Sequence, residues 1–197
     1  MDSRRSLATV VTLSILAAAP SACQIARAAG SDPNLRRSTT TLAVGYRRTP
    51  PAGSLVVLTP SGEVRLTARL VAGHVIAVTL ERAGGNPAVL DNVRDALLAD
   101  PDVRFVYPAL VHAPSGQMLL PTDRIVMKIR PGANAPEVIR RLPPALAVVR
   151  RLEGADDEYL LRLTDPRATD PTAVAAALAH EPWVAWAEPD FLREYAR

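Results

Sequence analysis

A segment of this chain repeats at a fixed distance of 81 residues. Asp100 in the first copy is matched in charge by Glu181 in the second, and six residues recur unchanged. The first copy carries Val93, Ala96, Leu97, Pro101, Val103 and Pro108, and the second carries Val174, Ala177, Leu178, Pro182, Val184 and Pro189. Each copy has the pattern of an amphipathic helix, a proline-marked turn and a short strand. The repeat therefore predicts two related units.

The length and apolar content fit two small units. The chain has 197 residues, of which 48% are hydrophobic and 4% aromatic. Such a chain can bury one medium core or two cores of about 70 residues each. Together with the repeat, this predicts units at residues 54–112 and 123–191.

The charge balance argues against a nucleic-acid partner. The formal net charge is +3, and removal of a leader that holds Arg4, Arg5, Arg27 and Asp2 lowers it to +1. Binding to nucleic-acid phosphates needs clustered Lys and Arg. No such partner is expected for this chain.

The first 28 residues have the pattern of a cleavable export signal. Two arginines precede an apolar run over residues 7–19, which is too short to span a bilayer. The small-x-small pattern at residues 26–28 fits cleavage before residue 29. The protein is therefore expected to be secreted or periplasmic.

Cys23 leaves a second destination open. It follows Ser21 and Ala22, and this sequence resembles the end of a lipoprotein signal, in which the cysteine becomes lipidated, although Pro20 stands where such signals usually carry Leu. Membrane contact is expected only if Cys23 is lipidated. On the soluble interpretation the mature chain has no cysteine and therefore no disulfide.

Three segments lack the periodicity of a helix or strand. Residues 29–53 mix Ser, Thr, Pro and Arg and are expected to form a disordered linker. Residues 113–121 are expected to be a spacer between the units. Residues 192–197 are expected to form an extended, mobile C-terminal tail.

The first unit has the pattern of three strands, a helix and a strand. Asn86 and Pro87 fit the N-cap and the first residue of the helix. An apolar stripe then marks its buried face, formed by Leu90, Val93 and Leu97. The runs that predict strands are residues 55–58, 64–71, 75–80 and 103–111.

The second unit has the order strand, helix, strand, strand, helix, strand. Its helices are marked by Pro136, which opens the first, and by Asp170 and Pro171, the N-cap and first residue of the second. The predicted strands are residues 124–130, 147–152, 159–163 and 184–191. This order is that of an α+β, ferredoxin-like βαββαβ domain, an antiparallel sheet with two helices on one face. The first unit is then a smaller, related β-rich unit with one helix.

The last strand predicts a docking surface. Strand residues alternate between faces, so one face receives small residues that fit beneath packed helices and the other face is left open. The predicted sets are Ala185, Ala187 and Pro189 under the helices, and Val184, Trp186, Glu188 and Asp190 on the open face. Tryptophan supplies buried area in an interface, and carboxylates accept hydrogen bonds from a helix N-terminus. An ordinary core tryptophan with two solvated acids remains the alternative.

Several segments of the second unit carry a family resemblance. They are RIVMKIRPGAN, the hairpin leading to YLLRL, the helix AVAAALAHEPWV, and above all the closing VAWAEPDF. With these segments the unit resembles the propeptide domain of subtilisin-like serine proteases, in particular the fervidolysin-type prodomain. The first unit, with ALLADPDVRFVYPALVH, is similar to the segment that precedes this prodomain in larger bacterial members of the family.

The resemblance implies an inhibitor and folding chaperone of a subtilisin-like serine protease catalytic domain. In that family the open sheet face docks on two protease helices, carboxylates cap those helices, and the C-terminal tail lies in the substrate cleft. The residues that match these partner-binding positions are Trp186, Glu188, Asp190, Leu192, Arg193, Glu194, Tyr195, Ala196 and Arg197.

Enzymatic chemistry is not expected in this chain. The sequence has no Asp-Thr-Gly, His-Gly-Thr or Gly-Thr-Ser signature of a subtilisin-like catalytic domain, so the propeptide-like unit is expected to act in trans. His74, His112 and His180 lack ligand spacing, and no Gly-rich phosphate loop is present. The acidic run of Asp156, Asp157 and Glu158 is interpreted as a solvated hairpin tip rather than a calcium site. No metal or cofactor is expected, and a secreted structural or interaction module, or an inactive protease fragment, is the alternative function.

Overall fold

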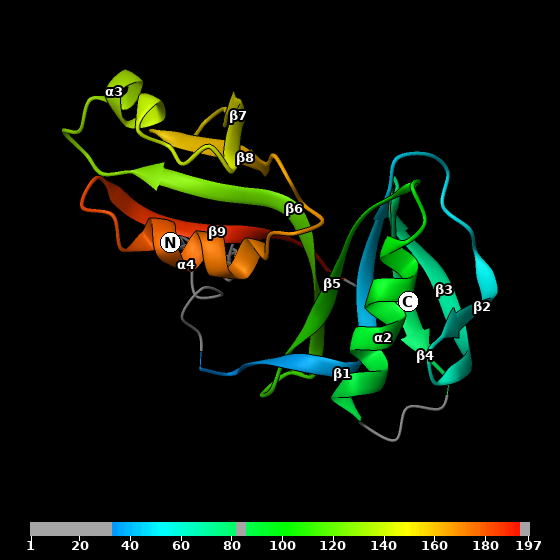
Figure 1. The fold of residues 1–197 in the computed structure, drawn as a ribbon. Coiled ribbons are helices and arrows are strands. Elements are labelled where there is room, and N and C mark those ends of the chain that lie inside the picture. The colour runs from blue at the N-terminus through cyan, green and yellow to red at the C-terminus, as the bar shows by residue number, and fades with distance from the viewer. Residues whose placement is uncertain (1–32, 82–85, 194–197) are drawn as a thin grey trace, which may run out of the picture.

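The structure is a computed structural model, and it describes residues 33–81 and 86–193. These residues form an α+β fold that consists mainly of one nine-stranded antiparallel sheet with three helices (Figure 1). The first half contains β1 (Leu35–Tyr46), β2 (Gly53–Thr59), β3 (Gly62–Ala72), β4 (Val75–Leu80), α2 (Pro87–Leu98) and β5 (Val103–His112). The second half contains β6 (Gln117–Ile129), α3 (Ala135–Arg140), β7 (Leu146–Arg151), β8 (Glu158–Leu163), α4 (Pro171–Ala179) and β9 (Val184–Arg193).

The first half is a sheet of order β2-β3-β4-β1-β5 with α2 packed on one face. The Asn86 side chain accepts a hydrogen bond from the Ala88 amide, which confirms the predicted N-cap. The predicted stripe of Leu90, Val93 and Leu97 is buried against the sheet. The first predicted helix and the strands around it are therefore confirmed.

The expectation of a disordered linker over residues 29–53 is wrong where the structure describes it. β1 lies between β4 and β5, and residues 41–46 are all buried. Leu42 and Val44 pack in the α2 core, while Ala43 packs on the opposite face. A strand that is covered on both faces does not show the alternation of a half-exposed strand. Its short apolar run between polar residues therefore gave no strand signal.

In the second half, β9, β6, β8 and β7 are neighbours in that order, and all their pairings are antiparallel. α3 and α4 contribute to one core, which includes Ile125, Met127 and Ile129 of β6. α4 is capped by Asp170, whose side chain accepts from the Thr172 amide. Ala175 and Leu178 of α4 face this core, whereas Ala177 is exposed.

The 81-residue repeat has a structural counterpart. β5 spans Val103–His112 and β9 spans Val184–Arg193, so the two strands begin and end at positions 81 residues apart. α2 precedes β5 as α4 precedes β9. Both halves therefore use the same helix, turn and strand, each with its helix packed on one face of the sheet.

β6 joins the two halves, and the predicted spacer at residues 113–121 is wrong. A short turn after β5 leads directly into β6, which begins at Gln117. The first residues of β6 pair with β5, and residues 124–128 pair with β8. β9 pairs with β6 along both parts (Figure 1). A strand with partners on both edges satisfies its backbone groups in the sheet rather than in water.

The predicted start of the mobile tail at residue 192 is also wrong. Leu192 and Arg193 belong to β9 and pair with Leu120 and Leu119 of β6. Leu192 packs against a small buried cluster formed by Ala43, Ala77, Ala109 and Leu120. The early start of β6 gives these two residues partners that the sequence did not indicate. Residues 194–197, and the predicted signal peptide, lie outside the described residues.

Side chains from β5 and from the loop before α4 hold the halves together. Phe105 and Tyr107 stack with ring centroids 4.9 Å apart and are buried in the core of the second half. The Tyr107 hydroxyl donates to the Pro166 carbonyl at 2.7 Å. Arg167 donates to the Val103 carbonyl at 2.7 Å and also to the Leu98 carbonyl at the end of α2. A guanidinium at a helix C-terminus is favourable because it faces the negative end of the helix dipole.

Gly45→Ala is expected to lower the free energy of unfolding by about 1–3 kcal/mol. A Cβ at Gly45 would overlap the Phe105 ring, which packs over the glycine from the neighbouring strand. Chemical denaturation measures the effect. In a Phe105→Leu background the same substitution should cost less, because the two positions are in contact. An equal cost in both backgrounds would contradict this account.

Candidate functional site

The side-chain directions along β9 differ from the predicted alternation at one end. Lys128 pairs with Trp186 but Ile129 pairs with Val184, so Ala185 is an extra residue in a β-bulge. The bulge turns Val184 into the core, where it is fully buried, and leaves Ala185 exposed. The predicted places of Val184 on the open face and of Ala185 under the helices are therefore wrong.

Beyond the bulge, β9 has one face toward the helices and one away from them. Ala187 packs in the core with α4, as predicted. Trp186 lies opposite Lys128, and Glu188 lies opposite Val126, on the face away from that core. We call this surface the open face, defined by Trp186 and Glu188 of β9, Val126 and Lys128 of β6, and Glu158 and Leu160 of β8. No helix of the described residues packs on it.

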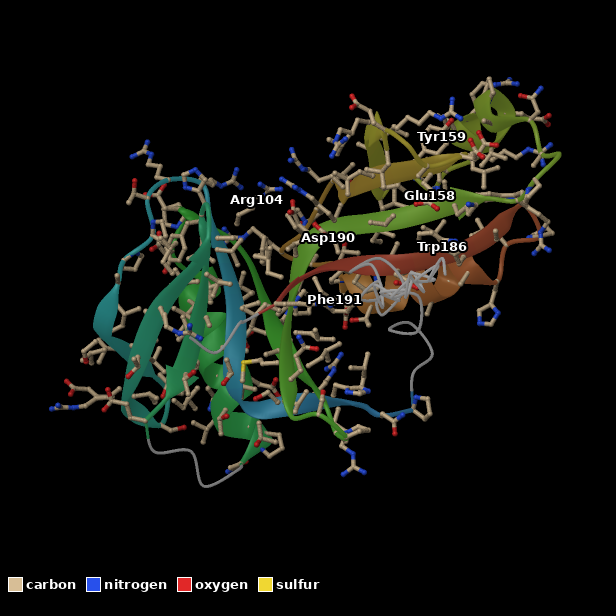
Figure 2. The ribbon with its side chains drawn as sticks, turned by 180° about the vertical axis from the view of Figure 1, so that it is seen from behind. Arg104, Glu158, Tyr159, Trp186, Asp190 and Phe191 are labelled. Atoms are coloured by element: carbon tan, nitrogen blue, oxygen red, sulfur yellow. The ribbon has the colours of Figure 1, made fainter. Side chains whose placement is uncertain are left out.

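The predicted docking residues differ in accessibility. Trp186 and Asp190 are half-buried, and Figure 2 shows them along β9. Glu188 was expected on an exposed docking face, but it is only 3% exposed, so its carboxylate is not at the surface. A partner could reach it only if the contacts around it change. The role of these residues in partner binding stays a prediction.

Glu158 is placed differently from its predicted position in a solvated acidic turn. It is the first residue of β8, is 4% exposed, and pairs with the Lys128 ammonium at 3.2 Å across the strands. Asp157 forms the turn with a φ of 53° and pairs with Arg151 at 3.1 Å. Within residues 33–81 and 86–193, no three His, Cys, Asp or Glu side chains form a group that could hold a metal ion.

A second bulge lies in β6 opposite Asp190. Pro121 pairs with Phe191 and Ile125 with Pro189, so residues 122–124 face a single residue of β9. The Thr122 hydroxyl donates to the Asp190 carboxylate at 3.3 Å. The bulge therefore fixes Asp190 beside β6 while one of its two oxygens keeps further accepting capacity.

The same bulge buries a carboxylate that sequence reasoning missed. The Asp123 side chain is 4% exposed and forms an ion pair with Arg104 of β5. Arg162 of β8 adds a second guanidinium, with its Nε 3.8 Å from the carboxylate. In the sequence, Asp123 was only the first residue of the predicted second unit, and nothing marked it as buried. Its partners lie on other strands and could not be read from local spacing.

Asp123→Ala is expected to destabilise the protein by about 3 kcal/mol, because it leaves two partly buried guanidinium groups without their carboxylate. Asp190→Ala is the matched control at the same bulge. It removes one long hydrogen bond of a half-buried acid and should cost less than about 1 kcal/mol. Urea denaturation of both variants measures the difference. Equal destabilisation would contradict the assignment of Asp123 as the structural acid.

Comparisons with protein-family models, with curated proteins and with solved structures gave no significant match for this chain. None of the helices that the structure describes is long and apolar enough to cross a membrane.

Proposed function

We propose that this chain is a propeptide-like inhibitor and folding chaperone of a subtilisin-like serine protease. The observation that carries the proposal is β9, an edge strand of the second half that presents Trp186 on the face opposite the helices and holds Asp190 beside the β6 bulge. No helix that the structure describes packs on this face, and Trp186 on it is only half-buried. The resemblance of VAWAEPDF to the closing strand of subtilase prodomains names the partner class.

The strand order supports the finer fold assignment within this proposal. The order β6, α3, β7, β8, α4, β9 with neighbours β9-β6-β8-β7 fits a ferredoxin-like domain. In such a domain two crossovers place the helices on one face. The second half would then act as the prodomain, and the first half would be the segment that accompanies it.

The docking chemistry assigns different roles to the residues of β9. Trp186 would be the apolar anchor, since tryptophans buried at the centre of an interface contribute most to binding. Asp190 would accept hydrogen bonds from the free amides at the N-terminus of a protease helix, a favourable place for a carboxylate. Glu188 would join it once the partner displaces the contacts that now bury the side chain.

The inhibitory segment would be shorter than the sequence predicted. Because β9 includes Leu192 and Arg193, the segment that enters the substrate cleft would begin at residue 194 rather than at residue 192. The end of β9 would then lie close to the substrate cleft in the complex. The leader pattern predicts that this activity lies outside the cytoplasm.

A secreted interaction module without inhibitory activity is the second candidate. Val56 and Leu58 on the edge strand β2 are 57% and 74% exposed, and exposed apolar side chains on a sheet edge favour association with another surface. This candidate predicts binding through the first half and no effect on protease activity.

The double variant Trp186→Ala/Asp190→Ala is expected to weaken inhibition of a susceptible subtilisin-like protease by roughly a hundredfold. This estimate combines about 2 kcal/mol for a tryptophan anchor with about 1 kcal/mol for a helix cap. The measurement is the inhibition constant with a small peptide substrate across a panel of such proteases. His180→Ala is the control, because His180 is exposed at the C-cap of α4 on the helix side. An unchanged constant for the double variant would exclude docking through β9.

Deletion of residues 194–197 is expected to abolish competition with small peptide substrates without lowering the melting temperature. Deletion of residues 192–197 should also lower the melting temperature, because it removes the packing of Leu192 and two paired strand residues. Thermal denaturation and inhibition kinetics on both truncations separate the effects. Full competitive inhibition after the shorter deletion would show that residues 194–197 are not the inhibitory element.

A further inference from the structure

A cavity of about 700 Å³ lies at the junction of the two halves. Its walls come from the ends of β1 and β4, from the β6 bulge, and from β8 and β9. Figure 2 shows Arg104 and Asp190 at this junction. The volume is within the range of pockets that hold small molecules, about 300–1,000 Å³.

The cavity contains more positive than negative groups. Four guanidinium groups line it, from Arg47, Arg104, Arg124 and Arg162. The two carboxylates in the lining are Asp123 and Asp190. Asp123 is held between Arg104 and Arg162, and Asp190 accepts from Thr122. Counted over these arginines and carboxylates, the lining carries an excess of two positive charges.

Two of the arginines have no carboxylate of their own. Within residues 33–81 and 86–193, no acid forms an ion pair with Arg47 or Arg124. The buried Nε of Arg162, although near Asp123, makes no hydrogen bond in that part of the chain. The site thus keeps unused donors beside a fixed, buried acid.

The arginines also repel one another. Burial lowers the pKa of Arg104, and the nearby charges of Arg162, Arg124 and Arg47 lower it further. Like charges within mutual reach in a partly enclosed space are unfavourable unless an anion compensates them. An anion that enters the cavity would reduce this repulsion.

We propose that this cavity is a binding site for a small oxyanion, a carboxylate or phosphate group, held by Arg47 and Arg124 with the Arg104–Asp123–Arg162 cluster as its fixed wall. The planar guanidinium fork matches carboxylate and phosphate oxygens with two parallel hydrogen bonds. Asp123 positions the wall and neutralises part of its charge, which leaves the charge of Arg47 and Arg124 for the ligand. Asp190 lines this cavity and is also a proposed docking residue, but Arg47 and Arg124, which would hold the oxyanion, take no part in the proposed protease contact.

The test measures binding of inorganic phosphate and of citrate to the purified protein by calorimetry and by melting temperature at constant ionic strength. A ligand that binds only the folded state raises the melting temperature. Arg47→Ala/Arg124→Ala should weaken binding about tenfold or more and remove the shift, since it deletes charge-assisted hydrogen bonds. Arg140→Ala/Arg150→Ala removes the same charge from exposed positions on α3 and β7 and should bind like the unmodified protein.

Each outcome decides the proposal. Binding of phosphate alone, of citrate alone, or of both identifies the preferred oxyanion, provided that the cavity variant loses it and the control variant keeps it. Arg47→Lys/Arg124→Lys should retain part of the affinity, because the charge remains while the fork is lost. If the alanine double variant does not fold, Arg47→Ala alone replaces it, since Arg47 is exposed. No binding of either anion, or equal binding by all variants, would overturn the proposal.

Discussion

The pairing of β6 with three other strands is the constraint on which the rest of the structure depends. Its N-terminal part continues the sheet of the first half through β5, its C-terminal part pairs with β8, and β9 runs along its other edge. The two cores would otherwise be separate small units, each near the lower limit of independent stability. A shared strand makes them one sheet, so neither half can shift without breaking backbone hydrogen bonds.

This shared strand changes partner at the bulge of residues 122–124, and the bulge explains where charge is buried. As β6 passes from β5 to β8, Asp123 lies between Arg104 and Arg162 from those two strands. A buried acid is stable only with its charge compensated. The ion pairs therefore require all three strands to be in place. The same arrangement brings Arg47 and Arg124 to the cavity, so the proposed oxyanion site follows from the way in which the halves join.

Both ends of β9 are fixed by packing. At its start, the bulge at Ala185 directs Val184 into the core, and at its end Leu192 packs on the alanine cluster of the first half. Between them, Trp186 lies on the open face. A strand fixed at both ends presents its central side chains in a constant geometry, as a docking strand needs. The proposed inhibitor function and the rigidity of the junction are in this respect consistent.

The sequence by itself determined the local elements. Asn86 and Asp170 cap helices as predicted, Leu90, Val93 and Leu97 are buried, and the repeat corresponds to strands with bounds 81 residues apart. These features depend on neighbours within one turn or one strand, so local patterns reveal them. Tertiary structure alone decided that β1 would be a central strand, that β6 would begin at Gln117, and that Asp123 would meet Arg104. The physical reason is that burial on both faces, bulges and buried ion pairs are set by residues far apart in the chain, whose meeting no local pattern records.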